Sequence, residues 1–199
     1  MASRPGRARP TEAALLADLA AADPGLRRAA AQALGAHPAA VPALRAALSA
    51  ETKRPVQEAL LAALTDIASA DAVAAMLGLL RAEDAWLRNA ALTALQEIGA
   101  PAAAPVRAVL DAADPDLRMA ALLALAGLRC PEAEAWTIAR LEQETEVNVC
   151  ATAIEVLDRI GGPASAPALD RLAGRFAAEP FLAFAARAVR DRLLGEPKA

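Results

Sequence analysis

The stretch that decides the fold is DPDLRMAALLAL, at residues 114–125. Asp114 stands where a helix N-cap belongs, because a carboxylate there accepts hydrogen bonds from the free backbone N–H groups of the first turn. Pro115 suits the first helical position, where its missing N–H group costs nothing. Leu117 is the first apolar anchor, and small and apolar residues follow it to Leu125, eight residues on. The stretch predicts an α-helix with one apolar face.

Four similar stretches recur along the chain. They are DPGLRRAAAQAL from Asp23, KRPVQEALLAAL from Lys53, DAWLRNAALTAL from Asp84 and EVNVCATAIEVL from Glu146. The five anchors, separated by 30, 31, 30 and 32 residues, are Leu26, Val56, Leu87, Leu117 and Val149. A sixth, degenerate copy has its anchor at Phe181, again 32 residues on. A period that holds through the chain predicts an array of structural repeats.

A second helix is expected after the first in each repeat. Gly35, Gly99 and Gly161 follow first helices, where a left-handed residue often ends a helix. Prolines stand near the heads of several second helices, at Pro38, Pro101, Pro131 and Pro163. The two helices form a hairpin that cannot bury its own apolar face. The hairpins are therefore expected to stack in register.

The pattern Asp-x-x-Leu-Arg-x-x-Ala-x-x-Ala-Leu resembles the short HEAT-like repeats of the phycobilisome-lyase type. The resemblance covers about residues 11–194. It implies that the first helices form an outer convex layer and that the second helices line a concave binding surface. Three positions depart from the pattern, since Lys53 replaces the cap acid and Gln57 and Cys150 replace the arginine. These departures favour a naturally diverged protein over a consensus design.

Composition supports the same fold class. Hydrophobic residues make up 56% of the 199 residues and aromatic residues only 3%, and Ala and Leu are strong helix formers. We expect an all-α protein, a right-handed α-solenoid of five to six HEAT-like hairpins with capping helices at both ends. The capping helices are expected to begin near Thr11 and Phe181. A single domain over residues 11–194 is expected between disordered tails, a basic one over residues 1–10 and a short one over residues 195–199.

Charge and hydropathy limit the possible partners. The net charge is −3, and residues 1–10 hold three arginines and no acid, which leaves 18 basic and 24 acidic residues in the rest. Such a body matches a polyphosphate backbone poorly, so we expect no nucleic-acid binding of the kind seen in HEAT-like DNA glycosylases. No apolar run reaches the roughly 18 residues of a membrane span, so no membrane association is expected. Two cysteines without a disulfide framework indicate a reducing cytoplasm.

The residue types that carry catalysis are sparse. His37 is the only histidine, which is too few for the two-histidine sets of zinc, di-iron or HEAT-repeat hydroxylase sites. Cys130 and Cys150 form no CxxC pair and are interpreted as apolar fillers, with redox or ligand roles as the alternative. The acids that recur with the repeat are interpreted as helix caps in an inter-repeat Asp–Arg ladder with Arg27, Arg88 and Arg118. We expect no catalytic site, no cofactor and no metal.

Arginines and tryptophans are the candidate partner-binding residues. The arginines on second helices are Arg45, Arg107, Arg140 and Arg171. A strip of this kind suits an acidic protein face or peptide, because arginine pairs bidentately with carboxylates. An ordinary solvated face is the alternative. Trp136 and Trp86 are further candidates for partner binding because tryptophan is enriched at protein interfaces. Tryptophan also serves as an ordinary packing residue, which is the alternative.

Two functions fit these features of the sequence. The first is a non-catalytic protein–protein interaction adaptor or scaffold, a cytoplasmic monomer that binds a partner protein or peptide on the concave face. The alternative, implied by the family resemblance, is a lyase-like or maturation subunit that handles a tetrapyrrole chromophore or cofactor of another protein. That alternative expects aromatic or basic residues in the groove, and the absence of tyrosine counts against it.

Overall fold

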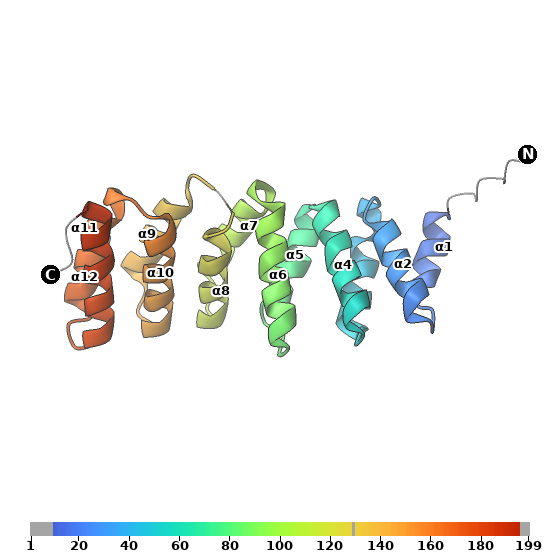
Figure 1. Ribbon diagram of the computed structural model, residues 1–199, viewed down its shortest axis with the longest axis horizontal. Coiled ribbons are helices and arrows are strands. Elements are labelled where there is room, and N and C mark those ends of the chain that lie inside the picture. The colour runs from blue at the N-terminus through green and yellow to red at the C-terminus, as the bar shows by residue number, and fades with distance from the viewer. Residues whose placement is uncertain (1–9, 129, 196–199) are drawn as a thin grey trace, which may run out of the picture. The chain divides into compact units, whose positions relative to one another are not determined.

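A computed structural model describes residues 10–128 and 130–195 (Figure 1). Within these residues the secondary structure consists of twelve α-helices and two short 3-10 helices, with no strand, which confirms the all-α repeat fold. The chain divides into two compact units, over residues 1–75 and 76–199. None of the helices in the described part combines the length and apolar character needed to cross a membrane. The predicted tails fall mainly outside the described residues, and the single domain stays a prediction.

The first unit contains two first helices, one second helix and a capping helix. Its elements are α1 (Glu12–Asp18), α2 (Pro24–Leu34), η1 (Pro38–Ala40), α3 (Val41–Ala50) and α4 (Arg54–Ile67). α5 (Ala70–Leu79) spans the boundary to the second unit. Helix α2 packs on α1 and α4, and α3 packs on α4. Buried leucines supply the core, among them Leu34, Leu44, Leu60 and Leu64.

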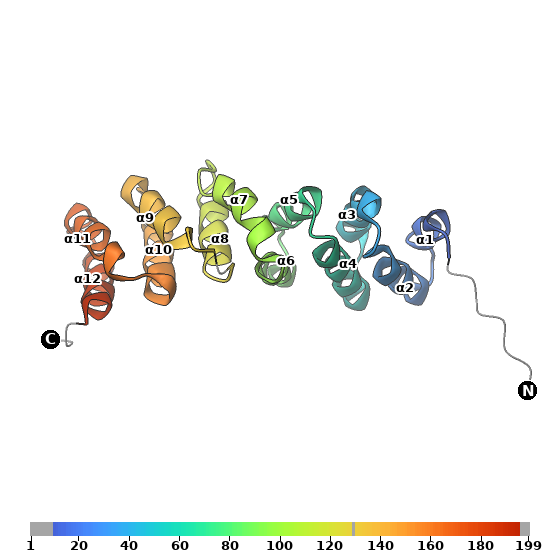
Figure 2. The same ribbon diagram turned by 90° about the horizontal axis from the view of Figure 1, so that it is seen from above.

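The second unit continues the alternation of first and second helices. Its elements are α6 (Ala85–Ile98), α7 (Ala100–Val109), α8 (Pro115–Leu125), α9 (Ala133–Gln143), α10 (Val147–Ile160), η2 (Pro163–Ser165), α11 (Ala166–Arg175) and α12 (Pro180–Leu194). Figure 2 shows α6, α8, α10 and α12 in one row and α7, α9 and α11 in a second row. Within the first row, α8 packs on α6 and α10, and α10 packs on α12. The two rows of this unit therefore correspond to the first and second helices of the repeats.

Helix starts follow the predicted cap chemistry. The carboxylates of Asp23, Asp84 and Asp114 each accept a hydrogen bond from a backbone N–H two residues on, at 2.8, 2.8 and 3.0 Å. Thr11 caps α1 through its hydroxyl oxygen, which accepts a hydrogen bond from the backbone N–H of Ala14, three residues on. Lys53, which departs from the repeat pattern, makes no side-chain cap hydrogen bond. Glu146 makes none either, so the predicted cap role is wrong for this acid.

Helix ends follow the prediction less well. Of the three glycines expected to be left-handed, only Gly99 has a positive φ, of 70°. Gly35 and Gly161 have φ values of −59° and −75°, so the prediction is wrong for them. Lack of room for a side chain accounts for glycine at position 161, because a Cβ atom there would lie 2.5 Å from the carbonyl oxygen of Leu157. The left-handed residue at the end of α4 is an alanine, Ala68, with φ of 48°.

The last helix, α12, exposes two phenylalanines on its outer side. Leu182, Ala183 and Ala186 are buried, as expected of a helix that closes a repeat array. Phe181 and Phe184, however, are 81% and 70% exposed. The polar outer side expected of a terminal repeat is therefore interrupted by two phenylalanines.

Candidate protein-binding surface

The arginine that follows the anchor binds two loops, the one that precedes its own helix and the one that leads into the next first helix. This set of contacts is called here a clamp. In the first repeat, Arg27 Nη1 donates to the backbone carbonyls of Ala21 and Ala22 at 2.8 and 3.0 Å. Its Nε and Nη2 donate to both carboxylate oxygens of Glu51, at 2.7 and 3.1 Å. This bidentate pair, with hydrogen bonds from the backbone N–H groups of the loop, lowers the pKa of Glu51 to about 2. The loop that leads into the next repeat is thereby tied to the first helix.

The fourth repeat contains the same clamp. Arg118 Nη1 donates to Ala112 and Ala113 at 2.9 Å each, and its Nε and Nη2 donate to Glu144 at 2.8 and 3.0 Å. The side chains of Arg118 and Glu144 are only 10% and 2% exposed. Burial by itself would raise the pKa of Glu144, but the hydrogen bonds from Arg118 and the loop backbone outweigh it and lower that pKa.

The predicted ladder, which paired the recurring arginines with the cap aspartates, is therefore wrong about the acidic partner. The cap aspartates accept backbone N–H groups at their own helix starts. Arg27 and Arg118 pair instead with Glu51 and Glu144, each two residues before a first-helix N-cap that is not aspartate. The sequence analysis did not predict these two glutamates, although both precede the two first-helix N-caps that are not aspartate, Lys53 and Glu146.

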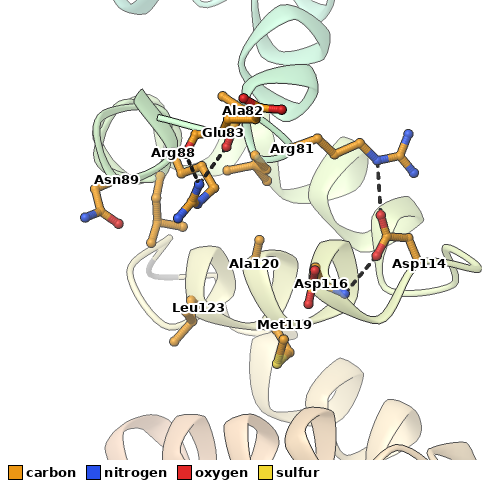
Figure 3. Close-up of a pocket in the computed structure, with 12 residues that line it drawn as sticks. Arg81, Ala82, Glu83, Arg88, Asn89, Asp114, Asp116, Met119, Ala120 and Leu123 are labelled. Atoms are coloured by element: carbon orange, nitrogen blue, oxygen red, sulfur yellow. Dashed lines mark hydrogen bonds and ion pairs between the residues drawn. The ribbon is translucent and has the colours of Figure 1, made fainter. Parts of the chain in front are cut away.

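The third repeat has the arginine without the glutamate. Arg88 Nη1 donates to the carbonyls of Ala82 and Glu83 at 2.6 and 2.9 Å, as in the other two clamps. The residue two before the next cap is Ala112. Arg88 lines an open groove of about 670 Å³, whose walls include residues of α6 and α8 (Figure 3).

Three predicted binding residues meet on the row of second helices. Arg107, Trp136 and Arg140 line one small depression together with Asp111. Arg107 Nη1 donates to Asp111 at 2.7 Å, and the half-buried Trp136 comes from the next second helix, α9. Arg140, only 13% exposed, lies 3.8 Å from Asp111 and 3.3 Å from the buried Glu144. Arg140 thus joins this depression to the clamp at Arg118.

The remaining predicted residues are spread over other elements. Arg171, on α11, donates through Nε to both carboxylate oxygens of Glu142 at 3.0 and 3.3 Å. Arg45 belongs to the first unit, where it is exposed and makes no ion pair within the described residues. Trp86 is half-buried in the first turn of α6, in the row of first helices. The three predicted arginines of α7, α9 and α11 each lie near a carboxylate, so this strip is not an uncompensated positive surface.

The two cysteines and the histidine each have neighbours that explain their place in the fold. Burial raises the pKa of Cys150 to about 11 and also raises the pKa of Cys130, so both thiols stay protonated at neutral pH. His37 Nδ1 lies 3.2 Å from a carboxylate oxygen of Glu12, which ties the turn after α2 to α1. Within the part of the chain that the structure describes, no three His, Cys, Asp or Glu side chains gather as a metal site.

Two consecutive segments match a family model. The model for HEAT repeats covers residues 41–106 and 104–189, which include the clamps of the third and fourth repeats. The chain belongs to the HEAT-repeat family. The resemblance drawn from the repeat pattern is thereby confirmed, and the hairpins described above are HEAT repeats.

Solved structures similar to this HEAT-repeat chain include an engineered protein from a structural genomics consortium. It is 19% identical, with a TM-score of 0.42, over 91% of this chain and 94% of that chain. Another is the complex of CpcE and CpcF of phycocyanin lyase from a Nostoc species. It is 21% identical, with a TM-score of 0.40, over 97% of this chain and 99% of that chain. No curated protein sequence matches the chain.

Proposed function

We propose that this HEAT-repeat protein is a non-catalytic adaptor that binds a partner protein through the row of second helices in its second unit. The observation that carries the proposal is the cluster of Arg107, Trp136 and Arg140 around one depression. Tryptophan and arginine are the residue types that contribute most to binding at protein interfaces. A half-buried indole beside pre-positioned guanidinium groups loses little side-chain entropy when a partner covers it.

The charge arrangement indicates the kind of partner. Arg107 and Arg140 already share Asp111, and Arg171 already pairs with Glu142. A partner that offers both apolar and charged side chains can replace the more exposed of these pairs, Arg107 with Asp111 and Arg171 with Glu142, by pairs of its own. A purely acidic face would instead meet Asp111 and Glu142. We therefore propose a mixed protein surface as the partner, with the adaptor acting as a cytoplasmic monomer that carries two free cysteines.

The experiment is affinity capture from the source cells with the full chain, followed by titration of the purified partner against variants. The test variant carries Arg107→Glu and Trp136→Ala. The control is Arg159→Glu, which makes the same charge change on the exposed side of α10, in the other row. Circular dichroism confirms that each variant is folded before binding is compared.

The proposal predicts a stoichiometric partner whose affinity falls at least about tenfold in the double variant and stays unchanged in the control. Capture of no protein at all would contradict the adaptor function. A partner that binds both variants equally would place the interface elsewhere and contradict the second-helix surface. A visible chromophore that co-purifies with the chain would favour the lyase-like alternative.

A further inference from the structure

Arg88 is fixed like Arg27 and Arg118. In all three arginines, Nη1 donates to the two backbone carbonyls six and five residues earlier. Two such bonds orient the guanidinium plane, because its donors form a rigid fork. In Arg27 and Arg118, the edge formed by Nε and Nη2 then receives a glutamate carboxylate.

The same edge of Arg88 has no partner. Among the described residues, Nε and Nη2 of Arg88 make no hydrogen bond or ion pair, because Ala112 occupies the glutamate position. The side chain is exposed and faces the groove between α6 and α8 (Figure 3). The third repeat therefore presents, already oriented, half of an interaction that two other repeats complete internally.

We propose that this groove, called here the Arg88 groove, receives a glutamate side chain from a partner protein. The carboxylate of that glutamate takes the place that Glu51 and Glu144 occupy in the other clamps. It accepts hydrogen bonds from Nε and Nη2 of Arg88 in the same bidentate geometry. The inference rests on the proposed function in one respect, that the partner is a protein. The Arg88 groove itself lies in the row of first helices, away from the surface formed by the second helices.

The rest of the groove selects a protein segment over a polyanion. Leu92, Met119 and Leu123 form an apolar wall beside the arginine, which suits an apolar residue next to the incoming glutamate. Glu83 and Asp116 also line the groove and make no ion pair with the described residues.

Arg81 and Asp114 also line the groove, where they pair with each other at 3.3 Å. The local charge is therefore slightly negative. Such surroundings accept one carboxylate at Arg88 but repel phosphate chains or nucleic acid.

The test uses NMR of the full chain and follows the Nε–Hε signals of the arginines. The probes are a peptide with one glutamate between leucines, its glutamine twin and sodium acetate. The glutamate peptide is expected to shift the Arg88 signal and the Met119 methyl signal. The glutamine twin is expected to bind at least about tenfold more weakly. The signals of Arg27 and Arg118 should not move, because their forks are already occupied.

A second variant keeps the test independent of the peptide. Ala112→Glu supplies the missing carboxylate from within the chain, so it is expected to raise the melting temperature by about 2–5 °C and to abolish peptide binding. Ala108→Glu, an exposed position on α7, is the charge-matched control and should do neither.

Equal binding of the two peptides, or an Arg88 signal that neither peptide moves, would overturn the proposal. Acetate that shifts Arg88 as strongly as the glutamate peptide would make the groove a small-carboxylate site and overturn the protein occupant. Either result leaves the adaptor function intact if binding of the captured partner still requires Arg107 and Trp136. The two proposals can therefore fail independently of each other.

Discussion

At the scale of single residues, one position in each of the first five repeats holds the loop that precedes its helix. Three side-chain types do this work. Arginine does so in three repeats. Gln57 Nε2 donates to the carbonyl of Glu51 at 2.7 Å, and Cys150 Sγ lies 3.8 Å from the carbonyl of Glu144. In each case the acceptor is six residues earlier. The departures from the repeat pattern thus preserve the backbone contact and remove the charge.

Breaking the buried clamp should be costly. Glu144→Gln leaves Arg118 and Arg140 as neighbouring cations with little solvent, so we expect a loss of about 3 kcal/mol or more in the free energy of unfolding. Urea denaturation measures it. Glu142→Gln, at the exposed pair with Arg171, is the control and should cost less than about 1 kcal/mol. Equal losses would show that burial does not decide the strength of these pairs.

The Glu51 clamp should make stability depend on pH in the acid range. Its pKa is about 2 in the folded protein against an ordinary value of 4.5, so folding favours the ionised carboxylate. The stabilisation is present above pH 4.5 and is lost as pH falls from there toward 2. Melting temperatures recorded across this range should therefore fall less steeply for Glu51→Gln than for the natural chain. A parallel decline in both would contradict the assigned role of Glu51.

The sequence predicts the cap aspartates but not the glutamates that pair with Arg27 and Arg118. The physical reason is that a cap depends on neighbouring residues in the chain, whereas these ion pairs join residues far apart in the sequence. Asp114 caps its own helix start, so its role depends only on adjacent backbone. Glu144 meets an arginine 26 residues away, which requires the loop to return alongside the first helix. The unpaired Nε and Nη2 edge of Arg88 is harder still to predict, because it results from alanine at position 112, where the other two repeats have glutamate.

At the scale of helices, starts are predictable and ends are less so. A cap aspartate must accept nearby N–H groups, so the sequence marks the residue directly. The end of a first helix depends on how closely the next helix approaches. At Gly35, a Cβ atom would lie 3.1 Å from Asp66 and 3.4 Å from Ala63 of α4. That glycine serves close packing, and its φ of −59° needs no left-handed residue.

Two glycines should respond oppositely to alanine. Gly161→Ala places a Cβ atom against the carbonyl oxygen of Leu157, so we expect a loss of about 1–3 kcal/mol. Gly174→Ala, within α11 and with nothing nearby, should stabilise by up to about 1 kcal/mol through helix propensity. Chemical denaturation of both variants checks the pair. A neutral Gly161→Ala would refute the close approach at the end of α10.

At the scale of the molecule, the period of the anchors predicts the repeat array, because each hairpin can bury its apolar face only on its neighbours. The outer side of the last helix does not follow from that period. Phe181 occupies the anchor position of the sixth copy, yet it is exposed, whereas Val149 at the fifth anchor is buried. Leu26, at the first anchor, is 49% exposed as well, so the anchor position alone does not decide whether the side chain is buried.

The exposure of the two phenylalanines can be checked by substitution. Phe181→Ser with Phe184→Ser should change the free energy of unfolding by less than about 0.5 kcal/mol, because neither ring is packed. Leu182→Ala, on the buried side of the same helix, should cost about 2–5 kcal/mol. Thermal melts of the two variants beside the natural chain measure both effects. A large loss in the phenylalanine variant would mean that the rings are buried in solution.

The most direct test of the adaptor function is hydrogen–deuterium exchange of the full chain with and without the captured partner. Slower exchange is expected over α7 and α9, where Arg107, Trp136 and Arg140 lie, and over α6 and α8 if the Arg88 groove is also filled. Protection confined to other helices, with α7 and α9 unchanged, would contradict the proposed binding surface.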